Sequence, residues 1–258
     1  MTGTVIRLDR AAGGGSVLQT ERELPRLDPG YLHELHAGAE DRAAALAFAF
    51  ALGCPAVAGT VVLARRGGRL GRVAAVPCGD GLVLLGIDPA RLVIVDAGGE
   101  LDVLRAGLEA ARCPGVGVVL VEAEGRFAPY DLTASRRLAL AAERTGGRVI
   151  VLRLGAEPRP SAAQTRWAIA SAPSVPLPTT PADAGAPGWP ALGVELLRRR
   201  GGPAGRRWRL EWDAGHGDFR TTGDGAALSG RVVPLSRGGT DAPGVGSGGS
   251  GQSEPRAA

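Results

Sequence analysis

The chain has 258 residues, of which 44% are hydrophobic, and its 30 lysine-plus-arginine and 26 acidic residues give a formal net charge of +4. All 30 of those basic residues are arginines, because the sequence contains no lysine. Their identity excludes a lysine-bearing phosphate-binding loop and Schiff-base chemistry, which both need the lysine amine.

Composition also predicts the class of fold and the compartment. Aromatic residues make up only 4% of the chain, so a core of Ala, Val and Leu in an α/β domain is expected. Cys54, Cys78 and Cys113 lack the spacing of a disulfide framework or a metal site, and we interpret them as reduced thiols. Residues 1–8 lack a signal-peptide pattern, and no apolar run approaches the ~18 residues that cross a bilayer, so we expect a cytoplasmic protein without membrane contact.

Both ends of the chain have compositions typical of flexible segments. Three consecutive glycines, at 13–15, lie in a leader that we place at 1–23. Residues 214–258 are dominated by Gly, Ser, Pro and Ala and cannot bury enough apolar surface to order themselves. We therefore expect a core domain over 24–213 and a disordered tail over 214–258.

Within the core, short apolar runs alternate with helical patterns, as in βαβ units with a mostly parallel sheet. Apolar β-branched runs predict strands, and 3.6-residue periodicity predicts helices. Asp131 or Thr133 can cap the last of these helices, which ends at Gly146. The predicted strands are 32–35, 60–64, 91–96, 117–122 and 148–154, and the predicted helices are 41–52, 101–111 and 131–146.

Beyond residue 161 the pattern changes to a period of two. Strands are predicted at 165–170, 193–200 and 207–213, the last two forming an antiparallel pair around a glycine-rich connector. Trp208, Leu210 and Trp212 alternate with charged residues, so we expect them on the core face of their strand.

Five segments of the predicted core carry a resemblance to known proteins: 32–35 (LHEL), 86–92 (GIDPARL), 131–143 (DLTASRRLALAAE), 161–167 (SAAQTRW) and the hairpin over 194–213. They resemble RecA-type recombinases and, more closely, the ImuA family of SOS mutagenesis accessory proteins. The resemblance covers roughly residues 24–213 and implies a RecA-like three-layer core, with a mostly parallel sheet extended by antiparallel C-terminal strands.

The position of the recombinase P-loop holds Gly38, Glu40, Asp41 and Arg42 in this chain. A helix N-terminus favours anions, but Glu40 and Asp41 would occupy that place, repel a triphosphate and cap the helix. We therefore expect a degenerate loop that is closed to nucleotide. The alternative is that Arg42 replaces the lysine as a phosphate ligand.

Glu122 ends a strand where the recombinase pattern has a metal-organising aspartate, and Glu124 follows it. Without a partner loop, Glu122 is interpreted as a vestigial strand end that is solvated or caps the next loop, with a Mg²⁺ ligand as the alternative. Asp96 has the same two interpretations. Arg65 and Arg66 stand where recombinases have an acidic catalytic residue, so no catalytic residue, cofactor or metal site is expected.

Arginines gather in two segments that could bind DNA or an acidic protein partner, because guanidinium groups pair with phosphates and carboxylates. A solvated charged hairpin is the alternative interpretation of the first, and a solvent-exposed connector that of the second. The first segment holds Arg198, Arg199, Arg200, Arg206, Arg207 and Arg209, and the second holds Arg65, Arg66, Arg69 and Arg72.

The ImuA resemblance implies a non-enzymatic scaffold for error-prone translesion synthesis during the SOS response to DNA damage. It also implies partners: an ImuB-type inert polymerase, an error-prone replicative-type polymerase and RecA itself, with single-stranded DNA as a further ligand. Three alternatives stay open: a SulA-like inhibitor of cell division, a plain nucleic-acid-binding module, and a RecA-like ATPase with a degenerate site. The ATPase would use Glu122 and Asp96 with Mg²⁺, and Arg42 or Arg66 on phosphate.

Overall fold

The computed structural model describes residues 24–54, 58–67, 77–174 and 188–222. All of them lie in one unit, Met1–Gly225, and a second unit comprises Ala226–Ala258. The predicted leader over 1–23, Arg69 and Arg72, and the predicted tail from residue 223 onward lie outside the described residues.

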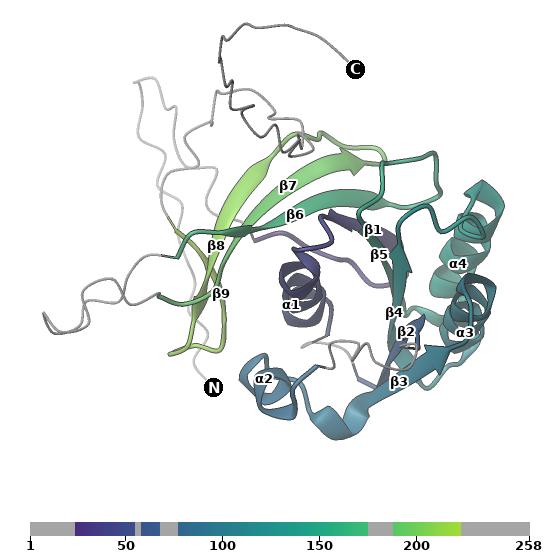
Figure 1. The fold of residues 1–258 in the computed structure, drawn as a ribbon, viewed down its shortest axis with the longest axis horizontal. Coiled ribbons are helices and arrows are strands. Elements are labelled where there is room, and N and C mark those ends of the chain that lie inside the picture. The colour runs from purple at the N-terminus through teal and green to yellow at the C-terminus, as the bar shows by residue number, and fades with distance from the viewer. Residues whose placement is uncertain (1–23, 55–57, 68–76, 175–187, 223–258) are drawn as a thin grey trace, which may run out of the picture. The chain divides into compact units, whose positions relative to one another are not determined.

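Nine strands of the described chain form one sheet in the order β3-β2-β4-β5-β1-β6-β7-β8-β9 (Figure 1). Neighbours from β3 through β6 pair in parallel, and those from β6 through β9 pair antiparallel. The strands are β1 (Leu32–Ala37), β2 (Thr60–Arg66), β3 (Leu92–Ala97), β4 (Val116–Glu124), β5 (Arg148–Leu154), β6 (Thr165–Ala172), β7 (Ala191–Arg199), β8 (Arg207–Asp213) and β9 (Asp218–Thr221).

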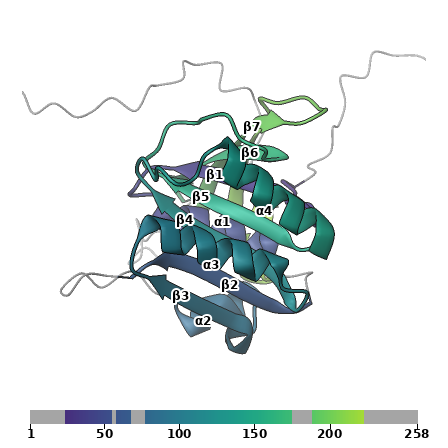
Figure 2. The ribbon, with the colours of Figure 1, turned by 90° about the vertical axis from the view of Figure 1, so that its right-hand side faces the viewer.

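Helices cover both faces of the parallel strands. The helices α3 (Glu100–Arg112) and α4 (Leu132–Thr145) lie side by side on one face (Figure 2). On the other face, the sheet curves around α1 (Arg42–Gly53), and α2 (Gly79–Leu84) lies on the same side of the sheet as α1 (Figure 1). The predicted fold class is therefore confirmed: three layers, with a mostly parallel sheet extended by antiparallel C-terminal strands.

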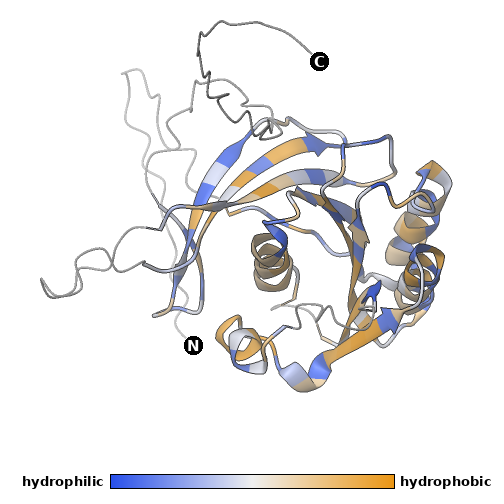
Figure 3. Cartoon of the chain, in the orientation of Figure 1, coloured by the Kyte–Doolittle hydropathy of each residue, from blue (hydrophilic) through white to orange (hydrophobic). Residues whose placement is uncertain are grey.

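Each face of the sheet has its own hydrophobic core. Around α1, the apolar side chains include Phe48, whose ring centroid lies 6.0 Å from that of Trp167 on β6. Figure 3 shows α1 apolar on all sides, as expected for a helix surrounded by a curved sheet. On the other face, Val103 of α3 and Leu138 of α4 pack against valines of β4 and β5. Polar and apolar positions alternate along α3 and α4 because each helix has one side against the sheet and the other side exposed.

Local sequence signals account for both ends of α4. The Asp131 carboxylate accepts a hydrogen bond from the Ala134 backbone N–H at 2.7 Å, and Gly146 ends α4 with a φ of +70°. A left-handed φ suits glycine because it lacks a β-carbon. The predicted bounds of β5 and β8 match the structure, and the other predicted strands differ by one or two residues at an end.

The strand β9 corrects the predicted boundary between core and tail. It pairs with β8, and its Phe219 is 3% exposed with its ring 5.3 Å from that of Trp212. Residues 218–221 therefore extend the ordered sheet beyond Asp213. One buried aromatic between polar neighbours gives too little alternation for a strand to be predicted from sequence. The helix α2 and the 3₁₀ turn Pro89–Arg91 were not predicted either.

None of the helices in the described segments combines the length and the apolar character needed to cross a membrane.

Candidate functional site

The loop predicted to occupy the P-loop position lies between β1 and α1, at the edge of the sheet where the parallel strands end. A β-carbon at Gly38 would overlap only the carboxylate of Glu40, whose exposed side chain could move aside. Asp41 stands at the N-cap position of α1 but makes no capping hydrogen bond. Its carboxylate instead accepts from the Ser171 backbone N–H at 2.8 Å, so it ties the start of α1 to β6.

Part of the prediction for this loop was therefore wrong. Neither Glu40 nor Asp41 caps α1, because Asp41 is drawn toward β6 and Glu40 is exposed beside Gly38. The side chain that closes the loop against the sheet is the first residue of α1, Arg42.

Arg42 joins α1 to the end of β4 by two ion pairs. Its Nη1 donates to Glu122 Oε2 and its Nη2 donates to Glu124 Oε2, both at 2.8 Å. The planar guanidinium suits this arrangement because its donors diverge at fixed angles, whereas a lysine ammonium is a single point of charge. Both donors of Arg42 therefore point at carboxylates of its own chain.

Glu122 is buried rather than solvated, which corrects the first of its predicted roles. Its residue is 7% exposed, whereas the side chain of Glu124 is 63% exposed. Burial raises the pKa of Glu122 above its ordinary value, and the positive charges of Arg42 and Arg65 oppose that rise. A buried carboxylate needs a cationic partner, and Arg42 supplies it.

A second ion pair lies one strand further along the same edge. Arg65, the residue before the last of β2, lies opposite Asp96 of β3, and its Nε donates to Asp96 Oδ1 at 2.7 Å. Arg65 is 4% exposed, so its predicted place in a solvent-exposed basic loop was wrong. The next residue, Arg66, is exposed. Arg65 is buried because parallel pairing continues through the residue and brings its side chain against the neighbouring strands.

We call Arg42, Arg65, Asp96, Glu122 and Glu124 the strand-end cluster. Its three carboxylates and two guanidiniums pair with one another, so the carboxylates considered for Mg²⁺ and the Arg42 guanidinium considered for phosphate are engaged within the chain, whereas Arg66 is exposed. Within the described segments, no three His, Cys, Asp or Glu side chains are grouped in a way that could hold a metal ion. The cluster therefore holds α1, β2, β3 and β4 together at the edge where a nucleotide site was considered.

A second buried polar group was missed from the sequence. Glu34 of β1 accepts from the Tyr130 hydroxyl at 2.6 Å and from Arg166 Nε at 2.7 Å. Burial alone would raise the pKa of Glu34, but hydrogen bonds from neighbouring side chains and the charge of Arg166 lower it to about 2. Arg153 of β5 lies over the Tyr130 ring, 5.4 Å from its centroid. The signal was present as charged residues inside apolar strands, which predict buried pairs.

In the basic hairpin formed by β7 and β8, some arginine side chains contact other residues of the chain and others are exposed without such contacts. Arg207 pairs with Glu195 of β7, with Nε and Oε2 3.0 Å apart, and the Arg206 guanidinium lies 4.8 Å from the ring centroid of Trp208. Arg198 and Arg209 donate to the backbone carbonyls of Ser161 and Pro173.

The side chains of Arg199 and Arg200 are exposed and make no hydrogen bond or ion pair with another described residue. The structure thus brings the six predicted arginines together in one hairpin and leaves these two open to solvent. Trp212 and Leu210 are buried, and Trp208 packs partly against the core, as predicted from their alternation.

Arg42→Ala tests whether the strand-end cluster is a structural closure. We expect a loss of about 2 kcal/mol near pH 7, because Glu122 stays buried with its charge unpaired. Burial raises the pKa of Glu122 in the folded state, so the folded state binds its proton more tightly than the unfolded state does. The variant should therefore regain stability as pH falls from about 7 to about 5, more than the wild type does.

Urea unfolding at both pH values measures this effect, and Arg66→Ala at the exposed end of β2 is the matched control. Equal stability of Arg42→Ala and wild type at both pH values would contradict the closure.

Comparison with known proteins shows which sequences are similar to this chain. No family model matches the chain. It is 44% identical over 148 residues to Protein ImuA from two strains of Caulobacter vibrioides, NA1000 / CB15N and ATCC 19089 / CIP 103742 / CB 15. The match covers 53% of this chain and 57% of each relative, so the chain spans just over half the length of the curated proteins it matches.

Two solved structures are similar at low identity. The RadB recombinase is 14% identical with a TM-score of 0.47, over 73% of this chain and 90% of that chain. SulA from Pseudomonas aeruginosa is 18% identical with a TM-score of 0.35, over 48% of this chain and 98% of that chain. The fold class follows from the strand order described above, and the resemblance first seen in the motifs is confirmed in the sequence: over 148 residues this chain is a homologue of the Caulobacter ImuA proteins.

Proposed function

We propose that this chain is an accessory protein of SOS mutagenesis that supports error-prone translesion synthesis without turning over nucleotide. The homology to ImuA directs the proposal to the response to DNA damage. The single observation that carries the non-enzymatic part is the pairing of Arg42 with Glu122 and Glu124. A nucleotide would have to displace that pairing, and displacement would leave a buried carboxylate without its counter-charge.

The role that remains for such a protein is to bring other components together through its surfaces. We propose as components an ImuB-type inert polymerase, an error-prone replicative-type polymerase and RecA. Arg199 and Arg200 support contact with single-stranded DNA or an acidic protein, because their side chains are exposed and have no partner among the described residues. Guanidinium groups bind phosphates in two-point contacts and remain charged at every physiological pH.

The function is tested in a bacterial strain that lacks its own copy of this chain. The wild-type chain should restore mutation induced by ultraviolet light. Glu122→Gln should restore it to the same level, because no step of a scaffold needs that carboxylate to organise Mg²⁺. Glu124→Gln, at an exposed position, serves as a second variant with little effect on folding.

Two results would contradict the proposal. If the wild-type chain does not restore induced mutation, the SOS role is wrong. If Glu122→Gln or Glu124→Gln abolishes it while the variant remains folded and expressed, the non-enzymatic part is wrong. Thermal unfolding and immunoblotting of each variant are the controls for these outcomes.

DNA contact by the basic hairpin is tested by fluorescence anisotropy with a single-stranded oligonucleotide over a range of salt concentrations. Replacing Arg199 and Arg200 by Ala should weaken binding and reduce the slope of log affinity against log salt by about 1.4, the value for two phosphate contacts. Arg207→Ala, which removes an arginine already paired with Glu195, should leave the slope unchanged. Binding that appears only with ATP, or that survives the double substitution, would contradict this contact.

A further inference from the structure

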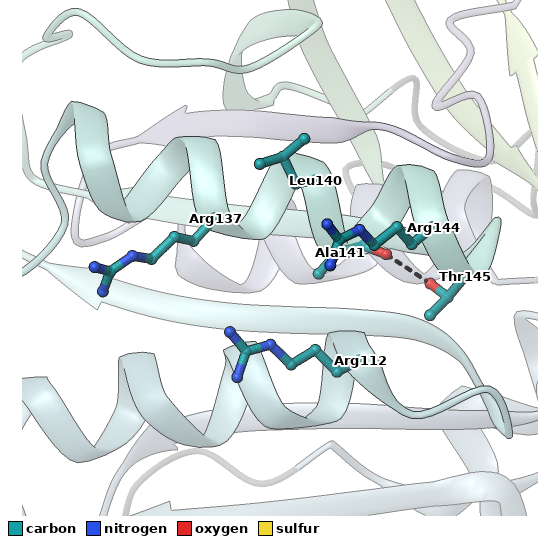
Figure 4. Close-up of a pocket in the computed structure, with 6 residues that line it drawn as sticks. All are labelled: Arg112, Arg137, Leu140, Ala141, Arg144 and Thr145. Atoms are coloured by element: carbon teal, nitrogen blue, oxygen red, sulfur yellow. Dashed lines mark hydrogen bonds between the residues drawn. The ribbon is translucent and has the colours of Figure 1, made fainter.

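A groove with a volume of about 300 Å³ lies between α3 and α4, on the face of the sheet opposite α1. Figure 4 shows arginines from both helices around it, with Arg112 of α3 facing the stretch of α4 between Arg137 and Arg144. We call it the α3–α4 groove. Its lining residues are Arg112, Arg137, Leu140, Ala141, Arg144 and Thr145.

The groove contains an exposed apolar side chain, Leu140, that does not take part in packing α4 against the sheet. Leu140 is 52% exposed, although α4 already buries Leu138, Ala141 and Ala142 against the sheet. A single exposed leucine is ordinary, but this one lies in a groove and beside Ala141, which forms part of the groove's wall. It offers an apolar contact that the fold itself leaves unused.

The charged part of the groove is entirely positive. Arg112 Nη1 donates to Glu109 Oε1 at 2.8 Å. Arg137 and Arg144 are exposed, and their side chains have no hydrogen-bond or ion-pair partner among the described residues. They lie seven residues apart, so about 10 Å of helix axis separates them, with Leu140 between them. No carboxylate lines the groove.

We propose that the α3–α4 groove binds an acidic amphipathic helix of a partner protein. Such a helix can place an apolar side chain on Leu140 and carboxylates two turns apart on Arg137 and Arg144, which is the helix-in-groove mode of recognition. An apolar centre surrounded by charged residues is also the usual arrangement of a protein interface.

Nucleic acid fits the groove less well than an acidic helix does. Its sugar-phosphate backbone would satisfy the arginines but would leave Leu140 without an apolar contact. Proteins that bind single strands also stack bases on aromatic side chains, and none lines this groove. The proposal rests on the recruiting role proposed above, since a scaffold needs a surface for a protein partner.

The test uses the full chain and a fluorescein-labelled synthetic helix, in which leucines recur every third or fourth residue and glutamates flank them two turns apart. A matched peptide carries Gln in place of every Glu. The wild-type chain should bind the Glu peptide more tightly than the Gln peptide in an anisotropy titration. Arg137→Glu should weaken binding of the Glu peptide about tenfold, because it places like charges together.

The matched control is Arg136→Glu. Arg136 is also exposed on α4 and its substitution changes the net charge equally, but it does not line the groove, so the affinity should stay near that of the wild type. Leu140→Ala should weaken binding about fivefold through lost apolar contact. Each variant is compared with wild type by thermal unfolding, and little change is expected because all three positions are exposed.

Several outcomes would overturn the proposal. No binding of the Glu peptide, or equal binding of the Gln peptide, would remove the acidic helix as the occupant. Equal losses with Arg136→Glu and Arg137→Glu would mean general attraction to a basic chain. A single-stranded oligonucleotide that displaces the peptide and loses affinity with Arg137→Glu would make the groove a nucleic-acid surface. If one of these results is found and the wild-type chain still restores induced mutation, only the groove proposal is overturned. If the peptide binds specifically but the wild-type chain does not restore induced mutation, only the proposed function is overturned.

Discussion

Arg42 is the first residue of α1, and its guanidinium group forms ion pairs with two carboxylates at the end of β4. One of these, Glu122, is buried and could not remain charged there without a nearby cation. The helix is therefore held to the strand by Arg42, the residue that was weighed from the sequence as a substitute phosphate ligand. Arg65 and Asp96 form a further ion pair on the next two strands of this edge.

With the strand ends closed, the surfaces that remain open lie elsewhere on the fold. In the β7–β8 hairpin, the side chains of Arg199 and Arg200 have no partner among the described residues. The same holds for Arg137 and Arg144, which line the α3–α4 groove. The groove combines charge with an exposed leucine, whereas the open hairpin positions offer charge alone. The two surfaces thus suit different ligands, an acidic helix for the first and a phosphate backbone for the second.

Local patterns predicted most of the fold. Asp131 and Gly146 bound α4 because capping depends on residues within one turn, and β5 was predicted from a mainly apolar, β-branched run. The pairing of Arg42 with Glu122 could not be predicted in this way, since it joins residues 80 apart whose proximity depends on strand order. Arg65 was misplaced for a related reason. Two arginines followed by glycines resemble a loop, and only pairing with β3 brings the first of them into the sheet.

Thermal unfolding of the wild-type chain with and without millimolar Mg²⁺ and ATP tests the central claim most directly. A ligand at 100 times its dissociation constant would stabilise the folded state by about 2.7 kcal/mol, which is readily seen as a rise in Tm. The closed strand-end cluster predicts no rise at any nucleotide concentration. A saturable rise that Arg42→Ala abolishes would contradict it and would make Arg42 a phosphate ligand.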